Sequence, residues 1–218
     1  MKHITRGSSM RFKGSGVLGI AAVSAALVLS GCSDGGGTTP DSSGAAPTSS
    51  AAPETTAPPT PKPATSTSPA ENIEPPVMPE EAKEFTAEGY EAFVNYWFEA
   101  HNYAYMTGDY RLVESASLGE CQYCSDTIRL AQATNANDGW QFGGDVTISD
   151  FYTPMSESSD GTVDAVFTFN QSFGAAYNAD GSPNEEVGEI PEFTLPFTFW
   201  ATYESEVGWK AAKIEPVQ

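Results

Sequence analysis

The aromatic residues of this chain are confined to its second part. All four Trp, all nine Tyr and eleven of the twelve Phe lie in residues 85–218, whereas residues 33–84 contain none and consist mainly of Ser, Thr, Ala, Pro and Gly. Aromatic side chains supply much of a hydrophobic core, so residues 85–218 are predicted to form a single globular domain. Residues 32–84 cannot bury enough apolar surface to offset their conformational entropy and are predicted to be a disordered tether.

The N-terminus has the three parts of a secretory signal peptide. Four basic residues precede an apolar run over Val17–Leu29, which ends in small residues. Thirteen helical residues span about 20 Å, short of the ~30 Å hydrocarbon core of a bilayer. We therefore expect a cleaved signal over residues 1–31 rather than a transmembrane helix. Met1 and Met10 are both possible starts, because the signal is complete from either.

The sequence Leu29-Ser30-Gly31-Cys32 closes this apolar run. It resembles the bacterial lipobox, which implies that the Cys32 thiol receives a diacylglyceryl group and becomes the new N-terminus. Two acyl chains give stable anchoring where one chain is marginal. The expected partner is therefore a lipid bilayer, held through acylated Cys32, with the protein on the extracytoplasmic face of the cell membrane.

The chain is strongly acidic. Four of its ten Lys and Arg lie in the predicted signal, which leaves six against 29 Asp and Glu and a formal charge of −23. Nucleic acid and anionic lipid surfaces repel such a protein, so nucleic-acid binding is excluded. The acidity either maintains solubility or selects a basic partner. No calcium-loop motif is present, and neither a metal site nor a cofactor is predicted.

Three helices are predicted at the start of the domain. Thr86 is suited to cap the first helix and Gly108 to end it. Apolar side chains recur there at spacings of three and four: Tyr90, Phe93, Val94, Trp97, His101, Ala104 and Tyr105. A short second helix is predicted at about 110–117 and a third over 125–135, before a cluster of Asn, Asp and Gly.

Strand signals follow the helices. Alternating or aromatic-rich segments occur at 145–152, 162–170, 193–203 and 209–214, whereas 178–190 is polar and is predicted to be an exposed loop. Helices followed by strands indicate an α+β domain. We predict three N-terminal helices packed on a curved antiparallel sheet of about four strands.

Two resemblances follow from these patterns. The long first helix, two shorter helices and a meander ending in Gly208-Trp209-Lys210-x-x-x-Ile214 resemble the cone-shaped nuclear transport factor 2-like fold. That fold implies an apolar cavity between the long helix and the sheet. The lipobox, Pro-rich tether, aromatic first helix and Cys-x-x-Cys are similar to an actinobacterial lipoprotein family with a domain of unknown function, which implies a location and no established activity.

Cys121 and Cys124 form a Cys-x-x-Cys sequence in the domain. Because Cys32 is assigned to lipid, these two cysteines of an exported protein are expected to form a disulfide. One interpretation is a local staple that contributes about 2 kcal/mol through loop-closure entropy. The alternative is a thiol–disulfide oxidoreductase, although no strand pattern precedes the motif as it does in thioredoxin-like folds. Two cysteines are too few for a structural zinc site.

Trp97, His101 and Tyr105 share the inward stripe of the first helix and are the candidate pocket residues. No second titratable group has a recognisable spacing to His101, so no catalytic residue is predicted. Five further aromatic residues either line a groove for a sugar or peptide or pack in the core: Trp140, Phe142, Phe173, Tyr177 and Trp200.

The expected function is a non-catalytic domain that binds a small ligand or an envelope protein. Two alternatives remain open. One is an isomerase- or dehydratase-like enzyme that uses His101, and the other is a redox protein that uses the cysteine pair.

Overall fold

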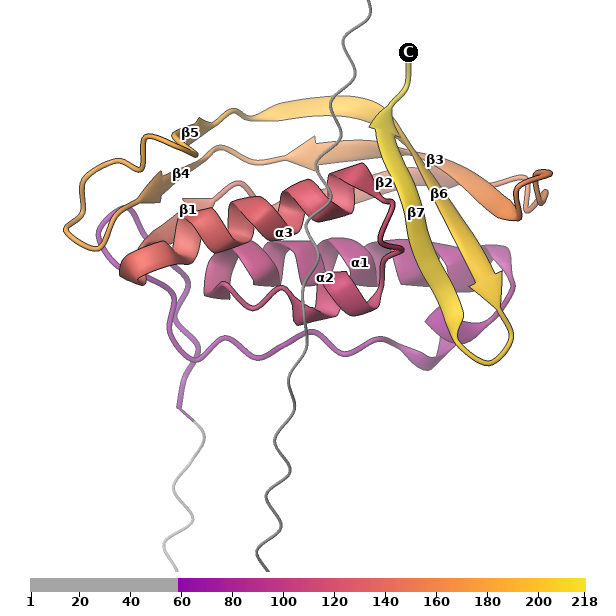
Figure 1. The fold of residues 1–218 in the computed structure, drawn as a ribbon, viewed down its shortest axis with the longest axis horizontal. Coiled ribbons are helices and arrows are strands. Elements are labelled where there is room, and N and C mark those ends of the chain that lie inside the picture. The colour runs from indigo at the N-terminus through magenta and orange to yellow at the C-terminus, as the bar shows by residue number, and fades with distance from the viewer. Residues whose placement is uncertain (1–58) are drawn as a thin grey trace, which may run out of the picture. The chain divides into compact units, whose positions relative to one another are not determined.

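The computed structural model describes residues 59–218. Its main sheet has four antiparallel strands in the order β2-β3-β6-β7 and curves over the helices (Figure 1). These strands are β2 (Val146–Tyr152), β3 (Thr162–Gln171), β6 (Phe193–Glu204) and β7 (Gly208–Pro216). The α+β class and the four-stranded curved sheet are thereby confirmed. The predicted signal peptide, Cys32 and the first part of the predicted tether lie outside the described residues.

The long helix α1 covers Ala87–Thr107 and begins and ends as its sequence indicates. The hydroxyl oxygen of Thr86 accepts a hydrogen bond of 2.9 Å from the Gly89 N–H, which caps the first turn. Gly108 ends the helix in the left-handed conformation, with φ of 77°. Glycine adopts this conformation without the steric cost that a Cβ would add.

Two shorter helices follow, α2 (Arg111–Ser115) and α3 (Gln122–Asn135). Helix α3 begins three residues before the predicted start at residue 125, because Cys121 caps it: its sulfur accepts from the Cys124 N–H at 3.3 Å. The Cys-x-x-Cys motif therefore lies in the first turn of α3. All three helices lie on the concave side of the curved sheet (Figure 1).

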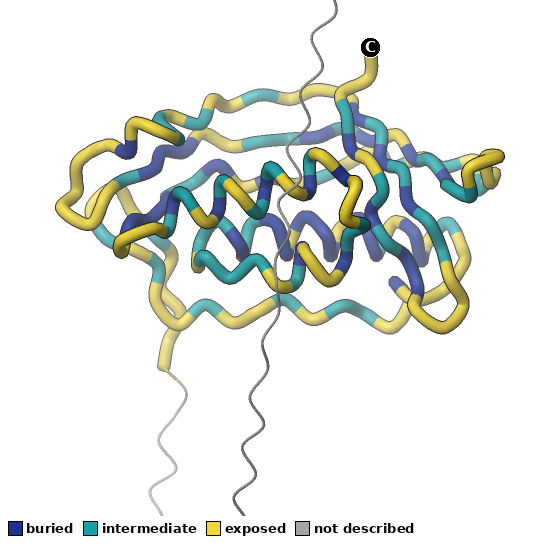
Figure 2. The backbone as a smooth tube through the Cα atoms, in the orientation of Figure 1, coloured by how far each residue is buried: buried dark blue, intermediate teal, exposed yellow. Residues whose placement is uncertain are grey.

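The core lies between α1 and the inner face of the sheet, where buried segments of both face each other (Figure 2). Phe98 contacts Phe167, Phe169 and Phe199 through edge-to-face packing, with ring centroids 5.6, 5.6 and 6.2 Å apart. Such pairs stabilise a core beyond the apolar area that they bury. This packing fixes the position of α1 under the strands.

A buried tyrosine joins α1 to the middle of the sheet. The Tyr90 hydroxyl lies 2.9 Å from the carbonyl oxygens of both Val163 and Phe199, so its single hydrogen is shared between β3 and β6. The ring also stacks on Trp209 of β7, with centroids 4.4 Å apart. Burial raises the pKa of Tyr90, so the hydroxyl stays protonated as a donor.

A second, smaller sheet was not predicted. It contains β1 (Trp140–Gly143), β4 (Gly174–Tyr177) and β5 (Glu189–Ile190) in the order β1-β4-β5. Strand β5 lies at the end of the segment predicted to be an exposed loop. Each of these strands has two to four residues, too few to show the alternation by which the longer strands were recognised.

The predicted domain boundary at residue 85 is wrong for the residues that the structure describes. Residues 59–84 follow the helical side of the domain from the region of β1 to the start of α1 (Figure 1). Lys62 pairs with Glu71 and Thr65 with Ser68 in antiparallel bridges, which we call the clasp (residues 62–71). The Trp140 indole N–H donates to the Thr65 carbonyl at 2.9 Å and holds the clasp against β1.

The other end of this segment is held in the same way. Ala82 in the short 3-10 helix Glu80–Lys83 is fully buried. The Tyr203 hydroxyl donates to the Lys83 carbonyl and the Trp209 indole N–H to the Glu84 carbonyl, each at 3.0 Å. A segment without aromatic residues is thus ordered by aromatic donors elsewhere in the chain, which bond its backbone carbonyls.

Within residues 59–218, no helix combines the length and the apolar character that a membrane crossing needs.

Candidate functional site

A cavity of about 340 Å³ opens between α1, α3 and the small sheet. His101 and Tyr105 of α1, Tyr123 and Leu130 of α3, Gln141 of β1 and Ile190 of β5 contribute to its lining. Acidic residues from α3, from the segment between β4 and β5 and from β5 itself also line it. The volume is within the range of small-molecule sites, roughly 300–1,000 Å³.

His101 lies among aromatic rings. Its side chain is 4% exposed, and its ring centroid lies 4.8 Å from that of Tyr105 and 6.1 Å from that of Tyr123, with the latter ring nearly parallel. Two of the three predicted pocket residues, His101 and Tyr105, therefore line one cavity. Trp97 does not: it is fully buried behind His101, with centroids 5.8 Å apart, and its indole N–H donates to the Ser117 hydroxyl.

The hydrogen bonds of Asn102 determine which nitrogen of His101 carries hydrogen. The Asn102 amide nitrogen donates to the Val146 carbonyl at 2.8 Å, and its oxygen accepts from the Val146 N–H at 2.9 Å. This pairing fixes the amide orientation. The same oxygen lies 3.1 Å from His101 Nδ1, so Nδ1 must donate. Nε2 then carries the lone pair in the neutral ring.

Burial keeps this ring neutral. Desolvation lowers the pKa of His101 to about 4, against a smaller opposing effect of the hydrogen bond to Asn102. At neutral pH the imidazole is thus an acceptor at Nε2.

Gln141 places a second polar side chain at the cavity. It is 5% exposed, and its Nε2 donates to the Gly143 carbonyl at 3.0 Å. Its Oε1 is buried and has no hydrogen-bond partner among the described residues. An unpaired buried acceptor costs about 1–3 kcal/mol, so its presence beside a cavity requires an explanation.

The two tyrosines of the cavity are neutral as well. Burial raises the pKa of Tyr105 to about 12, with the Thr127 hydroxyl acting in the opposite direction. Burial also raises the pKa of Tyr123, and Tyr105 contributes to this shift. Both phenols keep their hydrogen at physiological pH.

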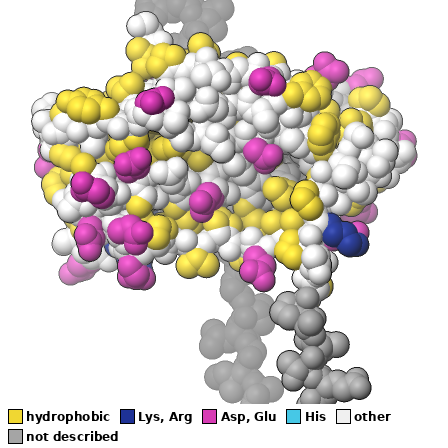
Figure 3. All heavy atoms as spheres, turned by 180° about the vertical axis from the view of Figure 1, so that it is seen from behind, with side chains coloured by type: hydrophobic (Ala, Val, Ile, Leu, Met, Phe, Trp, Pro, Cys, Tyr) yellow, Lys and Arg dark blue, Asp and Glu magenta, His cyan; other side chains and the backbone are white. Residues whose placement is uncertain are grey.

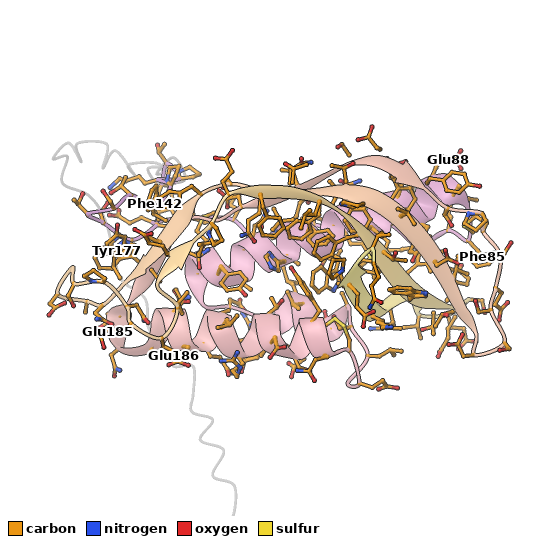
Figure 4. The ribbon with its side chains drawn as sticks, turned by 90° about the horizontal axis from the view of Figure 1, so that it is seen from above. Phe85, Glu88, Phe142, Tyr177, Glu185 and Glu186 are labelled. Carbon is orange, nitrogen blue, oxygen red and sulfur yellow. A yellow bond between two sulfur atoms is a disulfide. The ribbon has the colours of Figure 1, made fainter. Side chains whose placement is uncertain are left out.

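The acidic residues of the cavity are Asp126, Glu186 and Glu189. Arg129 lies 3.7 Å from carboxylate oxygens of both Asp126 and Glu186. Glu185 and Glu186 lie on the loop after β4, at the end of the molecule where α3 finishes (Figure 4). The described residues as a whole carry 26 Asp and Glu against six Lys and Arg. On the face shown in Figure 3, acidic side chains accordingly outnumber basic ones.

The cysteine pair is a disulfide in the structure, with Cα atoms 5.2 Å apart. Cys121 is 0% and Cys124 1% exposed, and both belong to the hydrophobic core. Thiol exchange needs an accessible sulfur, so this burial favours the staple over the redox interpretation.

The further aromatic residues do not form one groove. Trp140 stacks on Tyr177 in the small sheet, with centroids 5.4 Å apart, and Phe142 of β1 contacts Phe173, which precedes β4, at 6.3 Å. Phe142 and Tyr177 lie at the same end of the domain (Figure 4). Trp200 belongs to the main sheet and packs under the Lys213 ammonium, 4.7 Å from its centroid. These contacts favour the packing interpretation.

Sequence reasoning missed Tyr123 and Gln141 in the cavity. Tyr123 lies within the Cys-x-x-Cys sequence, and the motif itself says nothing about the role of the residues between its cysteines. Gln141 occupies a strand too short to be recognised, and no local pattern distinguishes it from a surface glutamine. Within the described residues, no group of three or more His, Cys, Asp or Glu is arranged to hold a metal ion.

Fold and site together define a class: an α+β domain with an open cavity between two helices and a small sheet, lined by a buried neutral imidazole. Residues 59–215 match the family of unknown function DUF6318, and the chain belongs to this family. No curated protein matches the chain.

Several solved structures are similar to it. The intermembrane space region of the chloroplast protein ARC6 is 15% identical over 61% of this chain and 96% of its own, with a TM-score of 0.44. A periplasmic fragment of TraM is 13% identical over 61% and 98%, with a TM-score of 0.38. An Ntf2-like protein involved in plasmid conjugation is 10% identical over 61% and 50%, with a TM-score of 0.35.

Proposed function

We propose that this protein is a lipid-anchored extracytoplasmic domain that binds a small ligand in the cavity between α1, α3 and the small sheet, without chemical turnover. The observation that carries the proposal is the cavity itself, about 340 Å³ and lined by His101, Tyr105 and Tyr123. An apolar lining with a few convergent polar groups is typical of small-molecule sites.

The anchoring part of the proposal is supported by the sequence before the domain. The lipobox-like Leu29-Ser30-Gly31-Cys32 provides an acylation site. Residues 33–58 then separate Cys32 from the described domain and are rich in Ser, Thr, Pro and Gly. A flexible chain of this length has an end-to-end distance of roughly 30 Å, enough to hold a ligand-binding domain away from a membrane surface.

The chemistry of His101 argues against turnover. Isomerases and dehydratases of this kind need an acid and a base with pKa values matched to their roles. Among the described residues His101 hydrogen-bonds only to the Asn102 amide, so no carboxylate orients the ring or raises its basicity. The neighbouring Tyr105 has a pKa raised to about 12, which makes it a weak acid.

The test is binding of 2-phenylethanol, a small aromatic alcohol, followed by NMR chemical shifts of the purified protein. We expect saturable shifts at residues of the cavity. Leu130→Trp fills the cavity from α3 and should abolish them. Gln132→Trp adds the same ring at an exposed position on the same helix and should leave them unchanged. No saturable binding, or equal binding by Leu130→Trp, would contradict the proposal.

A further inference from the structure

Two buried polar side chains of the cavity, those of His101 and Gln141, each have an acceptor atom without a partner among the described residues. His101 Nδ1 is occupied by Asn102, and Asn102 is itself locked to the backbone of Val146. The remaining nitrogen, Nε2, has only a lone pair to offer. Because α1 and β2 hold both ends of this chain of hydrogen bonds, the tautomer cannot change without breaking them.

Gln141 repeats this arrangement from a different element. The Gly143 carbonyl can only accept, so the Gln141 nitrogen faces it and the amide oxygen is left without a partner. The position of the Gln141 amide nitrogen also depends on Gly144, because a Cβ at residue 144 would lie 2.9 Å from this nitrogen. Gly144 has φ of 76°, a conformation that itself favours glycine. The backbone around Gln141 therefore fixes the amide nitrogen at Gly143 and leaves the buried amide oxygen without a partner among the described residues.

The charged residues around the cavity also favour a ligand that donates hydrogen bonds or carries positive charge. Asp126, Glu186 and Glu189 line it, and one guanidinium, Arg129, lies near the first two at 3.7 Å. An anionic ligand would meet carboxylates and lone pairs, whereas a cation would be attracted by both. The faces of Tyr105 and Tyr123 add a favourable surface for an ammonium group.

We infer that the cavity selects a small amine in its ammonium form, whose N–H groups donate to His101 Nε2 and Gln141 Oε1 and whose apolar part packs on the tyrosine rings. This inference rests on the proposed function, because it names the ligand class of the same cavity. It also explains why Gln141 keeps a buried oxygen unpaired: the ligand supplies the missing donor.

Three probes with one aromatic ring and similar size test the inference: 2-phenylethylammonium, 2-phenylethanol and phenylacetate. They differ in charge and in the number of donors. We expect the ammonium to bind at least tenfold more tightly than the alcohol, and phenylacetate to bind more weakly than both. Isothermal titration calorimetry of the full mature protein measures the three affinities.

Two variants then assign the acceptors. Gln141→Met keeps the length of the side chain but removes the oxygen, and His101→Phe keeps a ring but removes Nε2. Each should weaken 2-phenylethylammonium binding about tenfold, the value of one charge-assisted hydrogen bond. The alcohol has a single neutral donor, so each variant should weaken 2-phenylethanol binding by a smaller factor. Gln132→Met, at an exposed position on α3, is the matched control and should change neither.

The outcomes separate the two proposals. If all three probes bind equally, or phenylacetate binds best, the inference is overturned while the ligand-binding function stands. If no probe binds, the proposed function fails as well. If His101→Phe does not fold, the probe order in the unmodified protein and the effect of Gln141→Met still decide, because Gln141→Met leaves His101 unchanged.

Discussion

At the scale of single residues, two polar side chains are held where apolar ones would be easier to accommodate. His101 is neutral and buried among rings, and Gln141 keeps an oxygen without a partner. Each placement has a cost in folding free energy that a measurement can detect.

For His101 the cost depends on pH. Its pKa falls from 6.5 in a model peptide to about 4 in the folded protein, so the unfolded chain binds the proton more readily. Stability should therefore be full above about pH 6.5 and decline as pH falls toward 4, by about 2–3 kcal/mol between pH 7 and pH 4.5. Urea unfolding at several pH values measures this decline.

His101→Phe provides the control for that decline. The only other histidine of the chain, His3, lies in the predicted signal. The variant should lose most of the pH dependence over this window. Asp145, whose pKa is raised by burial, acts in the opposite direction, whereas Asp109, Asp160 and Asp180, whose pKa values are lowered by hydrogen bonds, act in the same direction as His101. An unchanged decline in the variant would show that His101 is not its source.

For Gln141 the cost in folding free energy does not depend on pH, because an amide does not titrate. Gln141→Met removes a buried acceptor without a partner, which costs about 1–3 kcal/mol, and also removes one hydrogen bond worth about 1 kcal/mol. We expect the free energy of unfolding to stay the same or rise by about 1 kcal/mol. Chemical denaturation checks this. A loss above about 2 kcal/mol would mean that the oxygen has a partner after all.

At the scale of elements, α1 determines both the core and the cavity. Its stripe of apolar residues at helical spacing predicted the buried face, including Phe93 and Trp97. The four longer strands were equally recognisable by their alternation. The small sheet was not, because β1, β4 and β5 are held by pairing with one another, a property that no short segment shows alone. The part of the site on α1 was thus predictable and the part on β1 was not.

Tyr90 joins these elements and gives a test at this scale. Tyr90→Phe keeps the ring but removes the hydroxyl shared by the Val163 and Phe199 carbonyls. We expect a loss of about 1–2 kcal/mol in the free energy of unfolding. Tyr152→Phe removes a hydroxyl from a side chain of β2 that is 67% exposed and should change stability by less than about 0.5 kcal/mol. Equal effects of the two variants would contradict this role of Tyr90.

At the scale of the whole molecule, the domain and its predicted anchor are separate parts of one chain. The described residues carry a large excess of acidic groups, so the domain itself has little attraction for an anionic bilayer. Attachment should then depend on Cys32 alone. The ordered course of residues 59–84 could not be predicted from the sequence. The groups that hold this segment are its backbone carbonyls, which every residue has, so no side-chain pattern marks them.

Cys32→Ser tests this dependence. The variant is made with residues 1–31 replaced by a secretory signal that is cleaved without lipidation. In cells it should then be found in the soluble extracytoplasmic fraction, because no acyl chain can be attached to serine in this pathway. Mass spectrometry of the unmodified protein should show a diacylglyceryl adduct at Cys32 as the first residue. A variant that stays in the membrane fraction after a high-salt wash would contradict lipid anchoring.

The clasp has a mechanical consequence for a domain attached by its N-terminal side. Tension entering the described chain at Pro59 reaches the Lys62–Glu71 pair before it reaches α1. The Trp140 indole, hydrogen-bonded to Thr65, then resists separation of the clasp from β1. The clasp and its contact with β1 therefore bear a pulling force first, and the helix that carries His101 is loaded only after the clasp separates from β1.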